Sequence, residues 1–393
     1  MSLEVAWASA LLVAIVLGTT ALPWFRFLDD KRPAPKRLAT IDGLRGVLAL
    51  SVFVYHLVMT HRYIESGVWE LPDSRYFRLL GPVGVSGFFM LTGLLFWGKL
   101  LNAEGRPRWG ALYLGRVFRI GPMYLVAVAV MLVIVFARTG LGLRVPADAL
   151  MSSLLQWLAL GLIDTQPDVN GQVASQLLAG VTWTLWYEWV YYLSLWVVAP
   201  FAKKRLHLSF SISLLALCLA AKLLWRFEMA GFAALFAMGM VVGSLLHEGI
   251  TLCHSNCAGS IAAMALLLLV LTTSSSGYGT WTALGLAGFF YLVCSGASLF
   301  GLLTTAAAQR LGAISYSLYL LQGLVLTLVL AIPPVRRLAM ASNLSYWVIG
   351  LACAWTLVLA AALGYTLIEA PGMAVGRRVA RWGPALPRSL TSR

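Results

Sequence analysis

The sequence predicts an all-α protein that crosses the membrane many times, a polytopic transmembrane helix bundle. Of its 393 residues, 60% are hydrophobic and only 11% are charged, whereas a soluble domain carries about 25% charged residues. Apolar runs of about 20 residues, the length of a helix that crosses a bilayer, recur along the whole chain. Such runs must be helical, because lipid offers the backbone no hydrogen-bond partners.

Eleven apolar runs separated by charged residues predict about 10–11 spans. The first run could be a signal peptide, but it lacks a basic start and a clear cleavage site, so we expect a retained helix. Residues 147–163 are apolar but short, and they predict one interfacial or re-entrant segment. The predicted spans are 4–25, 45–64, 81–98, 120–137, 182–201, 207–225, 229–247, 259–275, 280–303, 312–332 and 345–367.

The basic residues predict which ends of these spans face the cytoplasm. Most of the 29 lysines and arginines fall on one side of the predicted topology, with Arg336 and Arg337 as the main exceptions. By the positive-inside rule this side is cytoplasmic, so we expect the N-terminus outside and the C-terminus in the cytoplasm. Topology thus explains the net charge of +14 without a nucleic-acid partner.

A histidine partway along the second run is the most informative residue. His56 follows Arg45 by almost three helical turns, so both side chains share a face, about 16 Å apart along the axis. Ionisable groups inside a membrane are functional candidates by default. A neutral imidazole can accept a proton from a hydroxyl, donate one, or attack an acyl group. A histidine that is hydrogen-bonded between helices for packing fits the spacing equally well.

Three further charged residues complete the candidates. Glu188 lies about two turns into the run 182–201, at a depth that could approach that of His56. A carboxylate there would fix the histidine tautomer, and a protonated glutamate bonded to a neighbour is the alternative. Arg116 and Arg119 share one face at a helix start, which suits the phosphates of an anionic cytoplasmic molecule. Topology signalling toward anionic lipid explains them equally well.

Two other segments carry weaker patterns. The glycine-rich stretch 81–93 predicts close approach between helices. One cytoplasmic loop combines several potential metal ligands, but their spacing matches no zinc signature, so no metal is expected. These potential ligands are His247, Glu248, Cys253, His254 and Cys257.

Six motifs follow one another between about residues 40 and 372. An arginine and a histidine separated by ten residues, Arg45 and His56, come first, and GVSGFFMLTG follows at 84–93. The next three are Arg116, Arg119, Pro122 and Tyr124 in RxxRIxPxY; Trp183 to Tyr192 with Glu188; and ISYSLYLLQ at 314–322 with Ser315, Tyr316 and Gln322. The last is Glu369 with Pro371. Together they resemble the acyltransferase-3 family of membrane-bound O-acyltransferases, which includes the O-antigen acetylases.

The sequence departs from the family pattern at a few positions. Ser86 stands where an aspartate is usual, Thr92 replaces a serine, and Gln322 replaces a common histidine. An extra helix at 4–25 precedes the usual start of the family. We therefore divide the chain into an extra helix with a basic cytoplasmic linker, an acyltransferase-3 membrane domain and a basic cytoplasmic tail. The three parts are 1–40, 41–372 and 373–393.

The resemblance implies an O-acetyltransferase of the bacterial inner membrane. Such an enzyme moves an acyl group, commonly acetyl from cytoplasmic acetyl-CoA, to a hydroxyl of a glycan, a glycolipid or a small molecule such as a macrolide at the outer face. Arg45, Arg116 and Arg119 would hold the CoA phosphates. His56 would be the base or the transient acyl carrier, and Glu188 would orient it or engage the acceptor. The other motif positions expected to matter are Tyr124, Ser315, Tyr316, Gln322 and Glu369.

Two alternatives stay open at this point. A multi-spanning transporter or flippase would also combine many spans, a few buried ionisable groups and basic mouths, although the chain shows no inverted repeat. A non-catalytic sensor built on the same fold is the other alternative, which the glutamine at 322 leaves open. The expected partners are acyl-CoA, the acceptor and membrane lipids, while the oligomeric state is left open.

Overall fold

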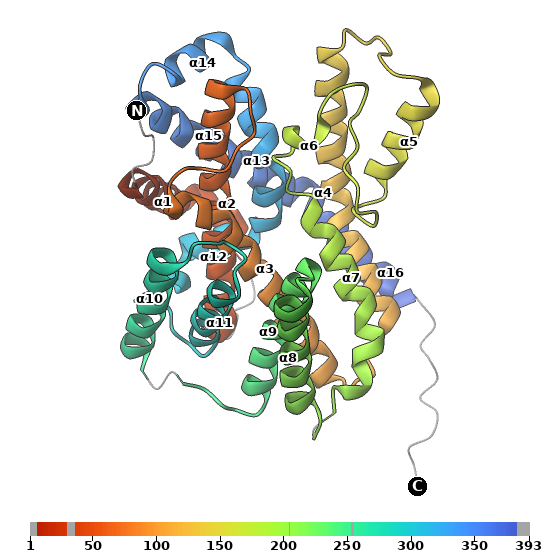
Figure 1. Cartoon of the computed structure of the whole chain (residues 1–393), viewed down its shortest axis with the longest axis vertical. Helices are drawn as coiled ribbons and strands as arrows, with labels where there is room; N and C mark the ends of the chain where they lie inside the picture. Colours follow the sequence, from red (N-terminus) through yellow and green to blue (C-terminus); the bar gives the residue numbers. More distant parts are fainter. Residues whose placement is uncertain (1–5, 30–35, 204, 253–254, 383–393) are drawn as a thin grey trace.

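The computed structural model describes residues 6–29, 36–203, 205–252 and 255–382, with residues 36–38 and 382 described by their backbone only (Figure 1). Within these residues no strand forms, and the only β pairing is an isolated bridge between Val169 and Gln172. The prediction of an all-α, polytopic helix bundle is therefore confirmed.

Every predicted span contains a helix. Seven helices are long and apolar enough to cross a membrane, and an eighth candidate is the pair α12 and α13, which meet at a bend of 71°. Three others, α1, α7 and α11, have only 15 or 16 residues, about 24 Å or less against a hydrocarbon core of about 30 Å. The helices are α1 (Ala6–Thr20), α2 (Lys36–Ser66), α3 (Arg75–Asn102), α4 (Trp109–Arg138), α7 (Trp183–Val198), α8 (His207–Trp225), α9 (Glu228–His247), α10 (Asn256–Thr273), α11 (Thr280–Cys294), α12 (Ala306–Ala313), α13 (Ser315–Leu330) and α15 (Asn343–Gly364).

The segment predicted to be interfacial or re-entrant forms a single short helix, α5 (Ala147–Leu158), beside α4 at the upper right of Figure 1. Its 12 residues span about 18 Å, which is too short to cross a bilayer. Leu150 and Trp157 are buried on one side, while Met151 and Leu155 are exposed. The remaining short elements are η1 (Pro23–Leu28), α6 (Ala174–Leu177), η2 (Ala199–Phe201), η3 (Leu302–Thr304) and α14 (Pro333–Ala339).

The last long helix has a local defect that shapes the site. α15 continues through a π-helical turn, η4 (Tyr365–Glu369), into α16 (Ala370–Trp382). Pro371 follows after one residue, and because it has no backbone N–H it cannot complete the ordinary hydrogen-bond ladder of the preceding turn. The wider turn leaves Glu369 fully buried inside the bundle.

Glycines allow the central helices to approach closely, as the glycine-rich stretch predicted. α3 lies between α2 and α9, and α8 packs on the outer side of α9. A Cβ at Gly93 of α3 would overlap the carbonyl oxygen of Phe236, and one at Gly239 of α9 would overlap that of Met90. These two positions therefore require glycine for the helices to touch.

The peripheral helices expose apolar side chains. Only 6% of the most apolar window of α8 and 22% of that of α10 is buried inside the bundle. Leu217, Leu223 and Leu224 on α8 and Leu268 on α10 each expose more than half of their surface. Such faces are those of helices that meet lipid, because a soluble protein rarely leaves large contiguous apolar surfaces uncovered.

Candidate active site

A large cavity opens inside the bundle, between α2, α3, α4, α7, α12, α13 and α16. Its volume is about 1160 Å³. It is lined by side chains of both charges, with arginines in excess. These are Arg45, Arg116, Arg119, Arg310, Arg377 and Arg381, against Asp29, Asp42 and Glu188. We call it the arginine cavity.

Arg116 is the arginine of this cavity that is best prepared for an added anion. Its guanidinium carbon lies 4.8 Å from the centre of the Phe96 ring, and Lys99 lies over the same ring at 4.6 Å. Its Nε is buried and makes no hydrogen bond within the described part of the chain. A buried charged donor without a partner is costly, so a ligand that accepts from Arg116 would remove that cost.

Arg119 is held in place by an acid from the other end of the sequence. It forms an ion pair with Glu369, and Ser317 Oγ donates to the second oxygen of that carboxylate at 2.8 Å. The pair depends on the π-helical turn, which turns Glu369 inward. From the sequence Glu369 was expected to matter only as a motif position, and its partner was not predicted. No spacing rule connects residues this far apart.

The other acidic groups lining the cavity also have partners. Glu188 Oε2 accepts a hydrogen bond of 2.6 Å from the hydroxyl of Tyr192, one helical turn away. Asp42 Oδ1 lies 3.3 Å from Arg45 Nη1. Glu188 and the three predicted arginines line one chamber. A place beside His56 was one expectation for Glu188, and a bond to a neighbouring residue was the alternative.

The extra N-terminal segment forms part of the cavity wall. Arg310 of α12 bonds both carboxylate oxygens of Asp29, at 2.6 and 3.0 Å, and donates to the carbonyl oxygens of Thr20, Ala21 and Leu22 at the end of α1. The Arg310 guanidinium lowers the pKa of Asp29 below its usual value. Phe27 and Asp29 of this segment, with Arg377 and Arg381 of α16, are exposed and border the mouth.

His56 lies outside this cavity, in aromatic surroundings. It is 8% exposed, and its Nδ1 lies 3.3 Å from Gln322 Oε1. The Gln322 amide Nε2 donates to the carbonyl oxygen of Tyr319, so its oxygen faces the histidine as an acceptor. Nδ1 must then carry the proton, which leaves the lone pair on Nε2. The backbone of Val52 also hydrogen-bonds the imidazole, and Nε2 is not one of the fully buried unpartnered side-chain atoms of the described residues.

About one helical turn separates His56 from the end of the arginine cavity. α3 runs antiparallel to α2, with Gly84 against Val52 and Gly81 against Tyr55. Val85 lines the cavity at the level of Val52, which is one turn before His56. Phe88 and Tyr319, which also line the cavity, meet edge to face with ring centres 5.8 Å apart. Tyr319 also lies one helical turn before Gln322, the residue that contacts His56.

The remaining predicted positions serve the frame or line the cavity. Tyr124 is buried, and its hydroxyl donates to the carbonyl oxygen of Trp157, which ties α5 to α4. Tyr316 lines the cavity and donates to the carbonyl oxygen of Ile120. Ser315 also lines the cavity, and its buried Oγ has no hydrogen bond within the described residues.

The weak metal pattern remains partly undescribed. His247 stacks edge-on against His207, whose Nε2 lies 2.9 Å from Glu248 Oε1. Cys253 and His254 lie outside the described residues. Across the ranges that the structure describes, no three His, Cys, Asp or Glu residues are grouped as metal ligands.

Comparisons with known proteins give one family and one relative. The acyltransferase domain profile matches residues 38–365. "Protein 2 in picA locus" of Rhizobium radiobacter is 33% identical over 119 residues, which are 30% of this chain and 55% of that protein. The chain thus spans about half the length of this relative. No solved structure gives a significant match.

Proposed function

The chain belongs to the acyltransferase-3 family, and we propose on that premise that it is an O-acyltransferase. The donor is acyl-CoA, with acetyl as the simplest acyl group, and it enters from the cytoplasm. The acceptor is a hydroxyl of a glycan, a glycolipid or a related molecule at the outer face. The bilayer is the inner membrane of a bacterium, with the C-terminus in the cytoplasm.

The observation that carries the proposal is the arginine cavity one turn away from His56. Its volume of about 1160 Å³ exceeds the range of roughly 300–1000 Å³ of pockets for drug-sized ligands, so it suits a molecule as large as a coenzyme. Within the described residues, the buried Nε of Arg116 and Oγ of Ser315 are donors without partners, which the phosphates and carbonyls of such a ligand require. Acyl-CoA therefore fits the chemistry of this chamber.

The step at His56 follows from its tautomer. With Nδ1–H donating to Gln322, Nε2 takes the proton of the acceptor hydroxyl while its oxygen attacks the thioester carbonyl. The carbon–sulfur bond breaks, and the imidazolium returns the proton to the CoA thiolate. The acyl-pantetheine arm has to extend about one helical turn beyond the arginine cavity to reach this nitrogen. In a variant of this step, Nε2 takes the acyl group first and the hydroxyl then removes it.

The charged residues act on the donor side of this reaction. Arg45 and Arg116 bind the CoA phosphates, and Arg119 is oriented by Glu369 at their side. Glu188 lies in the same chamber and accepts from Tyr192. We therefore assign Glu188 to the donor chamber, where its carboxylate lines the wall together with the arginines, rather than to the histidine.

The test uses acetyl-CoA that is radiolabelled in the acetyl group, added to membranes that contain the protein. Wild-type inside-out vesicles should transfer label to the glycan fraction, whereas sealed right-side-out vesicles should not. His56→Ala should lower the transfer at least about 100-fold, because a general base contributes about that factor or more. His207→Gln is the matched control, since this histidine is also buried but bonds Glu248 at a different site.

Two results would contradict the proposal. Full transfer by a His56→Ala protein that is inserted normally would exclude the histidine mechanism. Movement of an unmodified substrate across the vesicle membrane without covalent label would instead identify a transporter.

A further inference from the structure

The loop that joins α2 to α3 brings an aromatic ring to His56. Residues 67–74 are not helical, and within them Trp69 lies with its ring centre 6.5 Å from that of His56 and its plane within 23° of it. Tyr63 lies about two helical turns beyond His56 on α2. Its ring meets that of Trp69 edge to face, with the ring centres 5.7 Å apart. Trp69 is half-buried and Tyr63 is 37% exposed. The two rings therefore offer apolar surface immediately beside the imidazole.

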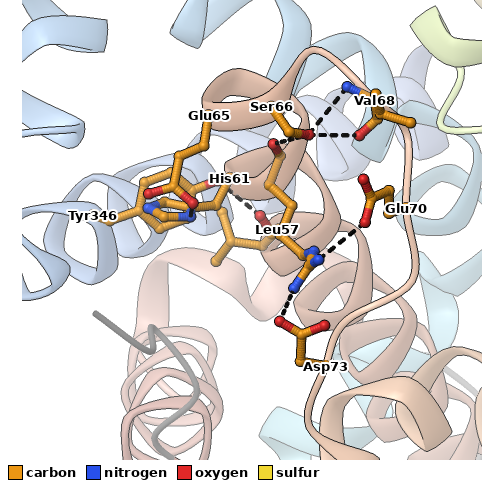
Figure 2. A network of polar contacts seen from close by, with 9 residues as sticks. Leu57, His61, Glu65, Ser66, Val68, Glu70, Asp73 and Tyr346 are labelled. Atoms are coloured by element: carbon orange, nitrogen blue, oxygen red, sulfur yellow. Dashed lines mark hydrogen bonds and ion pairs between the residues drawn. The ribbon is translucent and has the colours of Figure 1, made fainter.

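One arginine fixes the part of this loop that follows Trp69. Arg62 bonds Glu70 at 3.0 Å and also pairs with Asp73, as Figure 2 shows. Ser66 Oγ accepts from the backbone N–H of Val68 at 3.1 Å, just before the tryptophan. A loop without such bonds would sample many positions, and fixing it in advance lowers the entropy lost when a ligand binds. The position of Trp69 is thus set before any ligand arrives.

Three carboxylates at the end of α2 and in this loop are accessible acceptors. Side chains of Glu65, Glu70 and Asp73 are 56%, 44% and 79% exposed. A carboxylate has about four lone-pair sites, so the bonds to Arg62 leave Glu70 and Asp73 able to accept from further hydroxyls. This combination of aromatic faces and carboxylate acceptors matches the chemistry of a sugar ring. A pyranose has an apolar face of C–H bonds, which the negative face of an aromatic ring attracts, and a rim of hydroxyl donors.

We propose that Trp69 and Tyr63, with Glu70 and Asp73 at their edge, form the acceptor site, and that this site binds a pyranose ring of a glycan. The ring stacks on Trp69 and its hydroxyls donate to the two carboxylates, so that a neighbouring hydroxyl reaches His56 Nε2. The delivery of that hydroxyl rests on the proposed function, whereas the binding of the sugar does not. Trp69 is a positioning residue and Arg62 fixes its loop.

Another explanation of the same rings is an aromatic belt at the membrane surface. Belt residues anchor a protein in lipid and bind no solute, so the two roles differ in what a substitution changes. Trp281 provides the comparison, because it is 85% exposed and no ring contact joins it to another described residue.

The first experiment measures binding without any donor. Fluorescently labelled full-length protein in nanodiscs is applied to an array of bacterial surface oligosaccharides. We expect wild type and Trp281→Ala to bind a subset of these glycans and Trp69→Ala to lose at least about tenfold in affinity, with Trp69→Phe in between. An array that captures no wild-type protein, or equal capture by Trp69→Ala, would overturn the inference.

The second experiment measures transfer from radiolabelled acetyl-CoA to the glycan that the array captures best. Trp69→Ala should raise the KM for the glycan about tenfold and leave the KM for acetyl-CoA unchanged. An equal rise of both values would indicate a damaged fold and contradict the assignment. If Trp69→Ala transfers label to the glycan as well as the wild type does, the acceptor site is wrong but the acyltransferase function stands. Glycan binding that depends on Trp69, without any transfer of label, would support the sugar site and contradict the acyltransferase function.

Discussion

The arginine cavity and the surroundings of His56 lie about one helical turn apart and have opposite character. The cavity is large, contains six arginines and reaches an exposed mouth. His56 is 8% exposed, and it contacts aromatic rings and the neutral amide of Gln322. The arginines are thus concentrated where the donor would be held, whereas the hydrogen-bond partner of the imidazole side chain is a neutral amide.

This division has a chemical consequence. An arginine beside His56 would disfavour the imidazolium that forms during proton transfer, and a carboxylate would trap it. A neutral partner that only accepts from Nδ1–H fixes the tautomer and leaves Nε2 free to exchange a proton. If the division is functional, substitutions in the two regions should change different kinetic constants.

The largest difference between the effects on the two KM values is expected for a substitution of Arg116. Arg116→Ala removes a charge-assisted hydrogen-bond donor worth about 1.5–3 kcal/mol, so the KM for acetyl-CoA should rise roughly 10- to 100-fold. The KM for the acceptor should stay the same. Arg144→Ala is a matched control, because Arg144 does not line the cavity and its backbone N–H, rather than its guanidinium, bonds Asn170. Initial rates over a grid of both substrates measure the effect, and an equal rise in both KM values would erase the proposed division.

The sequence predicted much of this division but not its geometry. Apolar runs identified the helices, since lipid leaves the backbone no other solution. The spacing of Arg45 and His56 also survives, because α2 is one continuous helix through both residues. A pairing of Glu188 with His56 was one of two interpretations that depth allowed, because depth does not define the direction in which a side chain points. Its hydroxyl partner, Tyr192, is only one turn away on the same helix.

Other contacts could not be predicted from sequence because they join distant elements. Arg119 meets Glu369 only because a π-helical turn before Pro371 turns the acid inward. Arg310 reaches Asp29 across most of the chain. The contact of Gln322 with His56 had a signal in advance, since position 322 departs from the family histidine. Nothing in the neighbouring sequence, however, indicated that the residue at position 322 would be the partner of His56.

A smaller effect is expected at Gln322. Gln322→Leu leaves Nδ1 without its acceptor, and a neutral hydrogen bond of this kind contributes about 0.5–1.5 kcal/mol. We therefore expect kcat to fall about 2- to 12-fold with the KM for acetyl-CoA unchanged. Gln322→His, which restores the residue common in the family, should keep most of the rate. Pre-steady-state quench experiments isolate the chemical step, and a changed donor KM in Gln322→Leu would show that the two regions are not independent.

The smallest effect is expected at the ion pair of Asp29 and Arg310, which holds the extra N-terminal segment in the cavity wall. Asp29 carries a lowered pKa because Arg310 bonds it, so this pair stabilises the docked segment at pH values above the usual 3.8. The contribution is lost as the pH falls through the lower pKa of the folded protein. Asp29 is partly exposed, and such a pair contributes only about 0–1 kcal/mol. Hydrogen exchange of the peptide over Pro23–Leu28 should be faster in Asp29→Asn than in wild type near neutral pH, and the two should converge well below pH 3.8. Peptides that contain His56 should not respond, and a response there would couple the extra N-terminal segment to the histidine as well as to the cavity.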